Sequence, residues 1–204
     1  VVPQVLQGRF RFAMVWLLLG AAGLLWVSLR ALWVRFDEPD GVEITALEAP
    51  ELFERARESY FRNLHRVNGD QSVMFDGVIP GLELMKSMGL RLAVVTNKAT
   101  EFTLPLLERT GLAPYFQAVV CGDTLAHAKP HPAPMLHACG LLNSAPARSV
   151  AIGYSINDAQ SARAAGCSVL AVPYGYNEGQ SVQTLDVDAI VDSIEAAAHW
   201  VAVR

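Results

Sequence analysis

Short apolar runs alternate with helical patterns in the part of the chain that follows Phe75. Four runs have the length and the β-branched content of buried strands, namely residues 92–95, 118–121, 149–152 and 168–172. Between them, residues 101–110, 133–141 and 157–166 have helical patterns. Strands that alternate with helices in this way indicate an α/β protein with a mostly parallel, Rossmann-like sheet.

Two further helices are predicted ahead of the first of these strands. Residues 51–65 place apolar side chains at helical spacing among charged ones, which is typical of an amphipathic helix. A second helix is expected to begin near Pro80 and to end at Gly89. We therefore predict two parts, a helical region over residues 1–74 and an α/β core over residues 75–204.

The N-terminal part also contains a long apolar run. Residues 13–29 carry no charge, and the apolar pattern continues to residue 34, so we predict an apolar helix over 13–34 and then a turn and a loop as far as Pro50. Residues 13–29 fall slightly short of the about 20 apolar residues that a membrane-spanning helix needs. The run is therefore either a buried helix or a membrane anchor, and we favour the buried helix.

Charge and cysteine content narrow the possible partners. The 204 residues carry a formal net charge of −4 and no cluster of Lys and Arg, which argues against nucleic acid. The three cysteines are an odd number at no metal-ligand spacing, so we expect buried free thiols and a cytoplasmic, reducing location. The oligomeric state has no signature in the sequence.

Polar residues follow the predicted strands at positions suited to a ligand site. Thr96 and Asn97 come directly after one strand, and Asp158 follows another. Lys129 precedes prolines that are tolerated in the first turn of a helix. Ligands of open α/β sheets bind beyond the carboxyl ends of the strands, where a hydroxyl, an amide, a cation and a carboxylate suit a phosphate and a divalent metal. Taken singly, each residue could equally be a loop residue, a surface lysine or a helix cap.

The order and spacing of these segments resemble the motifs of the haloacid dehalogenase superfamily, and within it those of the bacterial phosphoglycolate phosphatases. Residues 94–98 (VVTNK) resemble the second motif, and residues 129–132 (KPHP) resemble the third. Residues 153–158 (GYSIND) resemble the fourth motif, usually G-D-S-x-N-D, and residues 173–177 (PYGYN) are similar to a stretch of the phosphoglycolate branch. The resemblance covers about residues 51–196.

The resemblance implies a role for each of the four polar residues. Thr96 would bind the transferring phosphoryl group with its hydroxyl, helped by the backbone N–H of Asn97, and Lys129 would neutralise negative charge. Asp158 would support a Mg²⁺ ion without contacting it directly and would hold Lys129 in place. The ligand would be a small phosphorylated metabolite, 2-phosphoglycolate. Members of the superfamily form an aspartyl-phosphate with a nucleophile from a first motif, D-x-D-G-T.

The sequence departs from the superfamily at two places. It contains no D-x-D-G-T, and the nearest string offers only Asp37 and Asp40 as candidate nucleophiles, with irregular spacing and an intervening proline. Tyr154 stands where the superfamily has the aspartate that ligates Mg²⁺, and a neutral phenol is a poor ligand for that ion. We therefore expect a phosphatase-type chain of impaired activity. The alternatives are a non-catalytic module that binds a phosphorylated metabolite or a partner, and a membrane-anchored relative.

The N-terminal run weakly resembles a helix of the cap that closes over the substrate in this superfamily. On this interpretation the chain begins inside a partial helical cap, as a truncated chain would. The strand that usually carries the first motif in the middle of the sheet would then be missing. The expected consequence is a gap in the sheet.

Overall fold

Strands and helices alternate along most of the chain, as the pattern predicts. The computed structural model describes residues 33–35, 43–45, 50–68, 73–174 and 181–203. The alternating elements are β3 (Ala93–Val95), α4 (Thr100–Arg109), β4 (Ala118–Val120), α5 (Ala133–Leu141), β5 (Val150–Gly153), α6 (Ile156–Ala165) and β6 (Ser168–Ala171). The α/β class is confirmed. The pattern did not predict the last two elements, β7 (Ala189–Ile190) and α7 (Ile194–Ala202).

The described strands of this region form two separate parallel ladders. One joins β3 to β4, and the other has the order β5-β6-β7. Within the described residues, no ladder connects β3 to β5. The expected gap is therefore present among the described strands, between β3 and β5.

Hydrogen bonds show which backbone groups border this gap. The N–H of Thr96 donates to Val120 of β4, and the carbonyl of Leu92 accepts from Gln117, so these two residues face β4. Backbone groups of neighbouring residues in a strand point to opposite edges, so those of Val95 point away from β4. Val95 is only half-buried, as is Ile152 on the corresponding edge of β5. Both strands thus have one edge without a partner strand among the described residues.

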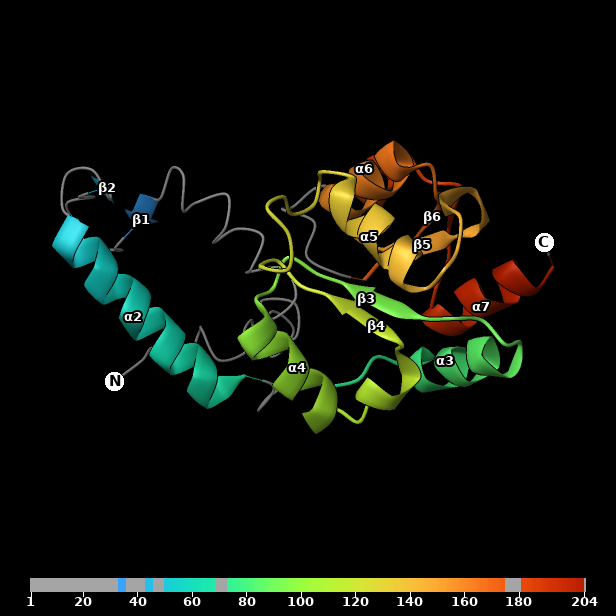
Figure 1. Ribbon diagram of the computed structural model, residues 1–204, viewed down its shortest axis with the longest axis horizontal. Helices are drawn as coiled ribbons and strands as arrows, with labels where there is room; N and C mark the ends of the chain where they lie inside the picture. Colours follow the sequence, from blue (N-terminus) through green and yellow to red (C-terminus); the bar gives the residue numbers. More distant parts are fainter. Residues whose placement is uncertain (1–32, 36–42, 46–49, 69–72, 175–180, 204) are drawn as a thin grey trace.

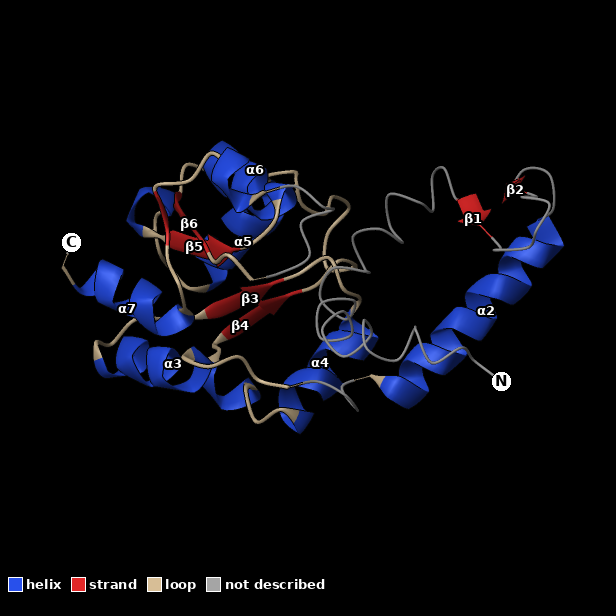
Figure 2. Ribbon diagram, turned by 180° about the vertical axis from the view of Figure 1, so that it is seen from behind, coloured by secondary structure: helices blue, strands red, loops and turns tan. Residues whose placement is uncertain are grey.

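Helices cover both faces of the strands (Figure 1). Helix α5 packs on β3 and β4, and α6 packs on β5 and β6. On the other side, α3 (Val78–Ser87) packs against α7, which also contacts β5. Figure 2 shows the same two layers from behind.

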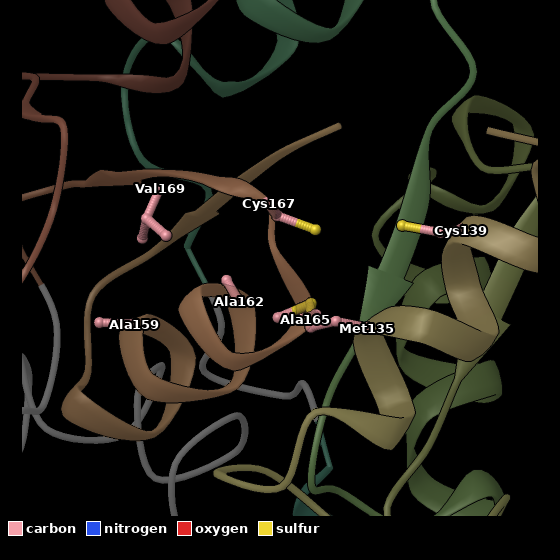
Figure 3. Close-up of a cluster of buried hydrophobic side chains, with 7 residues drawn as sticks. All are labelled: Met135, Cys139, Ala159, Ala162, Ala165, Cys167 and Val169. Carbon is pink, nitrogen blue, oxygen red and sulfur yellow. The ribbon is translucent and has the colours of Figure 1, made fainter. Parts of the chain in front are cut away.

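Small and sulfur-containing side chains fill the space between α5, α6 and the strands. Figure 3 shows this cluster, which contains Met135, Cys139, Ala159, Ala162, Ala165, Cys167 and Val169. Alanines on α6 allow the helix to lie close to the sheet because they add little volume. All three cysteines are free and buried, as the sequence analysis predicted.

The contact between α3 and α7 depends on Gly81. A Cβ at this position would lie 2.5 Å from the carbonyl carbon of Ile194 and 2.6 Å from the backbone nitrogen of Glu195. We expect Gly81→Ala to lower the free energy of unfolding by about 1–3 kcal/mol, because backbone atoms must move apart. Gly140→Ala is the matched control, since a Cβ there meets nothing within 4 Å and should be neutral or stabilising. Urea denaturation of both variants measures the difference, and equal effects would contradict the prediction.

Helix α2 (Pro50–Val67) corresponds to the predicted amphipathic helix at 51–65. It extends away from the α/β core in both ribbon views, and its C-terminal end meets α4 (Figures 1 and 2). The ring of Phe61 stacks on Phe102 of α4 with centroids 5.6 Å apart, and His65 lies 3.0 Å from Glu101. The last turn of α2 is thereby attached to the first turn of α4.

The predicted apolar helix at 13–34 is wrong at its C-terminal end. Trp33–Arg35 forms strand β1, which pairs antiparallel with β2 (Glu43–Thr45) inside the segment predicted as a loop. Aromatic and β-branched residues such as Trp33 and Val34 favour strands, and this preference overrides the continued apolar pattern. Residues 13–29 lie outside the described residues, so their helical structure stays a prediction. Of the helices that the structure describes, none has the length and apolar character to cross a membrane.

Candidate functional site

Lys129 lies at the centre of the polar residues that follow β3 and β5. Its Nζ donates to Oδ1 of Asp158 at 2.6 Å and to the carbonyl oxygen of Val95 at 2.7 Å. Both charged side chains are only 11% exposed. The ammonium therefore connects the free edge of β3 to the helix that follows β5. An ammonium has three N–H donors, and these contacts use two of them.

The start of α6 holds Asp158 by a capping box. Ser155 is the N-cap residue, and its hydroxyl accepts from the Asp158 backbone N–H at 3.3 Å. In return, Oδ2 of Asp158 accepts from the backbone N–H and the hydroxyl of Ser155 at 3.1 and 2.8 Å, and from the Tyr154 N–H at 3.2 Å. Gly153 leaves room for this carboxylate, because a Cβ there would lie 2.5 Å from the Asp158 Cβ. The carboxylate is thus fixed from three directions.

These contacts keep Asp158 ionised although it is buried. Burial by itself would raise the pKa of the carboxyl group. The charge and hydrogen bond of Lys129, with the hydrogen bonds from Ser155 and the Tyr154 backbone, outweigh burial and hold the pKa of Asp158 below its usual value. Lys129 and Asp158 therefore form a fixed ion pair at neutral pH.

Asn97 positions the backbone of Lys129. Its Nδ2 donates to the Lys129 carbonyl at 2.8 Å, and its Oδ1 accepts from the Lys129 N–H at 2.9 Å. The amide side chain is occupied by this pair of bonds and is a poor candidate for direct contact with a ligand. The backbone N–H of Asn97 makes no hydrogen bond within the described residues. The role that the resemblance implies for Asn97 uses this backbone N–H and not the side chain, and it stays a prediction.

Thr96 is buried, with 6% of its surface exposed. Its Oγ1 accepts from the backbone N–H of Lys98 at 3.1 Å. The hydroxyl proton therefore remains for an outside acceptor. Thr96, Asn97 and Lys129 each retain one donor in the same part of the molecule, an arrangement suited to an anion such as a phosphoryl group.

Comparison with known proteins places this chain in a family. A family model described as haloacid dehalogenase-like hydrolase matches residues 35–172. The chain belongs to the haloacid dehalogenase-like hydrolases. The match begins in β1 and ends at residue 172, so it includes most of the described residues.

Relatives of this hydrolase family resemble the chain over most of its length. A phosphoglycolate phosphatase of Thiobacillus denitrificans is 50% identical over 159 residues, which are 78% of this chain and 70% of that protein. One from Nitrosospira multiformis is 48% identical over 74% of this chain and 66% of that protein. The crystal structure of a predicted phosphoglycolate phosphatase from Haemophilus somnus superposes with a TM-score of 0.73 at 28% identity, covering 93% of this chain and 81% of that one. The match therefore spans about two thirds of the length of each sequence relative.

The structure leaves the two candidate nucleophiles of the sequence analysis untested. Asp37 and Asp40 lie outside the described residues. Asp186 and Asp188 have the D-x-D spacing of the first motif, but they lack its Gly-Thr and stand near the C-terminus. They form ion pairs with Arg163 at 3.4 and 3.0 Å. Asp188 also accepts from the Val169 N–H at 2.7 Å. The Asp186 and Asp188 carboxylates tie the end of α6 to the segment before β7 and play a structural part.

The donor set around Tyr154 does not fit a Mg²⁺ ion. No three His, Cys, Asp or Glu side chains of the described residues are grouped as metal ligands. Burial, and after it the negative charge of Asp158, raises the pKa of the Tyr154 phenol, so this oxygen stays protonated at neutral pH. Both oxygens of Asp158 are already occupied by hydrogen bonds. Mg²⁺ prefers carboxylate oxygens and water, which Tyr154 does not replace.

Sequence reasoning missed one residue of this site, Ser155, and the burial of a neighbouring residue, Lys98. Ser155 completes the capping box with Asp158, and its S-x-x-D spacing is a known start signal for a helix. Lys98 was noted only as the last residue of the motif that contains Thr96. Nothing in its pattern distinguishes it from a surface lysine, although its side chain is 1% exposed.

Proposed function

We propose that this chain carries the phosphate site of a phosphoglycolate phosphatase-type hydrolase, which acts on phosphoric monoesters. The observation that supports this most directly is the position of Lys129, held by Val95 and Asp158 with one N–H to spare. The high identity to phosphoglycolate phosphatases supports 2-phosphoglycolate as the ligand. An ammonium fixed by a buried carboxylate retains its charge and orientation when an anion binds.

Each residue of the proposed site has a separate task. The Thr96 hydroxyl donates its proton to a phosphoryl oxygen, and the Asn97 backbone N–H donates to a second one. Lys129 offsets the negative charge of the phosphoryl group, and Asp158 keeps Lys129 in position. In the family reaction the same ammonium would also lower the repulsion between a carboxylate nucleophile and the phosphoryl group. No step is assigned to a metal ion, because the described donors do not fit one.

Binding measurements test this proposal without requiring turnover. We expect inorganic phosphate and 2-phosphoglycolate to bind saturably at millimolar or lower concentration in isothermal titration. Thr96→Val and Lys129→Met should each weaken binding about tenfold or more, since each removes a donor to a charged group. Thr184→Val and Lys86→Met are matched controls at exposed positions and should bind like the parent chain. Absence of saturable binding by the parent chain would refute the proposal.

A non-catalytic binding module is the second candidate. It is favoured by Tyr154 at the metal position and by the absence of D-x-D-G-T from the sequence. This function uses the same residues for phosphate, but leaves the phosphoryl group on its ligand. Saturable binding of 2-phosphoglycolate that is recovered unchanged after prolonged incubation would select this candidate over the hydrolase.

Replacement of Tyr154 should restore part of a metal site. We expect Tyr154→Asp to raise Mg²⁺ affinity by about tenfold or more, because a carboxylate replaces a protonated phenol beside the Asp158 carboxylate. Phosphate release should nevertheless remain near background, since the substitution supplies no nucleophile. Titration with MgCl₂ measures the gain, with Tyr154→Phe as the control that removes the phenol without adding charge. Equal Mg²⁺ affinity in both variants would show that this position is not a metal position.

A further inference from the structure

The ammonium of Lys98 is buried and has no hydrogen-bond partner among the described residues. Its side chain is among the largest fully buried ones, with 1% of the residue exposed. Nζ makes no hydrogen bond within the part of the chain that the structure describes. The phosphate site described above does not use this ammonium, although Lys98 lies next to Asn97.

A buried, unpaired cation is costly in the absence of a ligand. An ammonium transferred out of water loses its hydration, and only a charged or polar partner replaces that loss. Burial lowers the pKa of Lys98 to about 8, so the group is still mostly protonated at neutral pH. Proteins seldom bury a lysine fully without such a partner. The ligand-free chain therefore holds a positive charge that an anion would stabilise.

The backbone of Lys98 is anchored to both sides of the candidate site. Its N–H donates to the Thr96 hydroxyl at 3.1 Å, and its carbonyl accepts from Gly122 at 2.9 Å and from the Thr103 hydroxyl at 3.3 Å. Thr103 belongs to α4, and the neighbouring Phe102 carbonyl accepts from buried Asn68 at 2.8 Å. Lys98 thus lies between the phosphate donors and the end of α2.

The carboxylates of Glu101, Asp123 and Asp158, in segments adjacent to Lys98, have other partners. Glu101, in the first turn of α4, pairs with His65 at 3.0 Å. Asp123 accepts from the backbone N–H and the hydroxyl of Thr100 at 2.9 and 2.6 Å. Asp158 is bound to Lys129. None of these three carboxylates is available to Lys98, and a ligand held at Thr96, two residues away, would bring another anion into this region.

We propose that Lys98 binds a second anionic group, a carboxylate, on the ligand whose phosphoryl group lies at Thr96, Asn97 and Lys129. This rests on the proposed function and adds a determinant of specificity to it. The ammonium of Lys98 is closed to solvent in the ligand-free chain, and its flexible four-carbon stem would turn it toward the carboxylate when the ligand binds. The resulting charge-assisted hydrogen bond would favour phosphorylated carboxylic acids over simple phosphate esters. Lys98 binds the substrate in this scheme and takes no part in phosphoryl transfer.

Two phosphate esters of the same chain length distinguish the contribution of the carboxylate to binding from that of the phosphoryl group. Ethyl phosphate has the phosphoryl group and the two-carbon chain of 2-phosphoglycolate, but no carboxylate. In isothermal titration at pH 7, we expect the parent chain to bind 2-phosphoglycolate about 30-fold more tightly than ethyl phosphate, as for a buried charge pair. Lys98→Met should lose this preference and bind the two esters with similar Kd. Lys86→Met, at an exposed position, should keep the preference.

The outcomes distinguish the two proposals. Equal affinity of the parent chain for both esters would overturn the assignment of Lys98, and this comparison does not depend on the folding of any variant. A preference that survives in Lys98→Met would also overturn it, with the proposed function intact. Failure of the parent chain to bind phosphate, ethyl phosphate or 2-phosphoglycolate would overturn both. Thermal unfolding gives a second readout, because removal of an unpaired buried charge should raise the Tm of ligand-free Lys98→Met, and a lowered Tm would show that Lys98 has a partner within the chain.

Discussion

The 204-residue chain, incubated with 2-phosphoglycolate and Mg²⁺, is expected to release phosphate at a rate near background. Among the described residues the site holds neither a carboxylate placed to attack the phosphoryl group nor, with Tyr154 at that position, a carboxylate that would ligate the metal. Groups that act as a unit lose activity non-additively, and the loss of one alone costs on the order of 10⁴-fold or more. In the proposed function Thr96 and Lys129 bind and orient the phosphoryl group, but neither replaces the nucleophile.

A steady-state assay of phosphate release at several Mg²⁺ concentrations measures this rate. Lys129→Met, purified in parallel, is the control for contaminating phosphatases, because a contaminant would give the same rate in both preparations. Substantial metal-dependent release that is lost in Asp37→Asn or Asp40→Asn would contradict the prediction. It would show that the segment containing these two residues supplies the nucleophile.

The gap between β3 and β5 gives a structural reason for the same expectation. The Lys129 ammonium lies at the end of this gap, where it bonds to the carbonyl of Val95. A carboxylate at the end of a strand between β3 and β5 would lie next to that ammonium, because the carboxyl ends of parallel strands meet at one edge of a sheet. In the described residues no strand occupies that place. The proposed phosphate donors are therefore present among the described residues without a strand that would carry the nucleophile.

The sequence predicted the α/β core well because its elements have strong local signals. Helix α5, at Ala133–Leu141, has the predicted bounds, and strand β6 is shorter than predicted by one residue. The resemblance also indicated which residues would lie together, and Lys129 does contact Asp158. Their catalytic roles remain proposals, since contact between two residues does not establish what they bind.

Other features depend on contacts that a single sequence does not encode locally. The two hydrogen bonds between the Asn97 side chain and the Lys129 backbone join residues that are 32 positions apart. The burial of Lys98 results from tertiary packing, whereas its residue type alone favours a surface position. Trp33 was assigned to a helix because an apolar run has no periodicity that separates a buried helix from a strand. Its partner strand β2 decides the structure there.

Removal of the Asp158 carboxylate is expected to destabilise the fold strongly. Asp158→Ala should lower the free energy of unfolding by about 3–5 kcal/mol, because it leaves the Lys129 ammonium buried without its ionic partner. The substitution also removes the acceptor for three donors at the start of α6. Urea denaturation at pH 7, followed by circular dichroism, measures the loss. Asp186→Ala removes a carboxylate that is 83% exposed in its ion pair and should change stability by about 1 kcal/mol or less.

A double-mutant cycle separates the ion pair from the helix cap. Ser155→Ala alone should cost about 1 kcal/mol, since it removes the cap hydroxyl and leaves Lys129 and Asp158 paired. Lys129→Met alone should cost nearly as much as Asp158→Ala, because it leaves the carboxylate unpaired. The double variant Asp158→Ala/Lys129→Met should then be less destabilised than the sum of the two single variants, since neither buried charge remains. Additive losses would show that the two side chains do not interact energetically.

The pH dependence of stability gives an independent check of the same pair. The pKa of Asp158 is lowered in the folded chain, so the folded state binds fewer protons at this carboxyl than the unfolded state does. The stabilisation is therefore fully present above the pKa of an unfolded aspartate, about 3.9, and is lost as the pH falls through the lower folded value. The difference in unfolding free energy between the parent chain and Asp158→Asn should accordingly be constant from pH 5 to 7 and should shrink below about pH 4. A difference that stays unchanged down to pH 3 would mean that Asp158 is not ionised in the folded chain, and that Lys129 is held in position by the Val95 carbonyl alone.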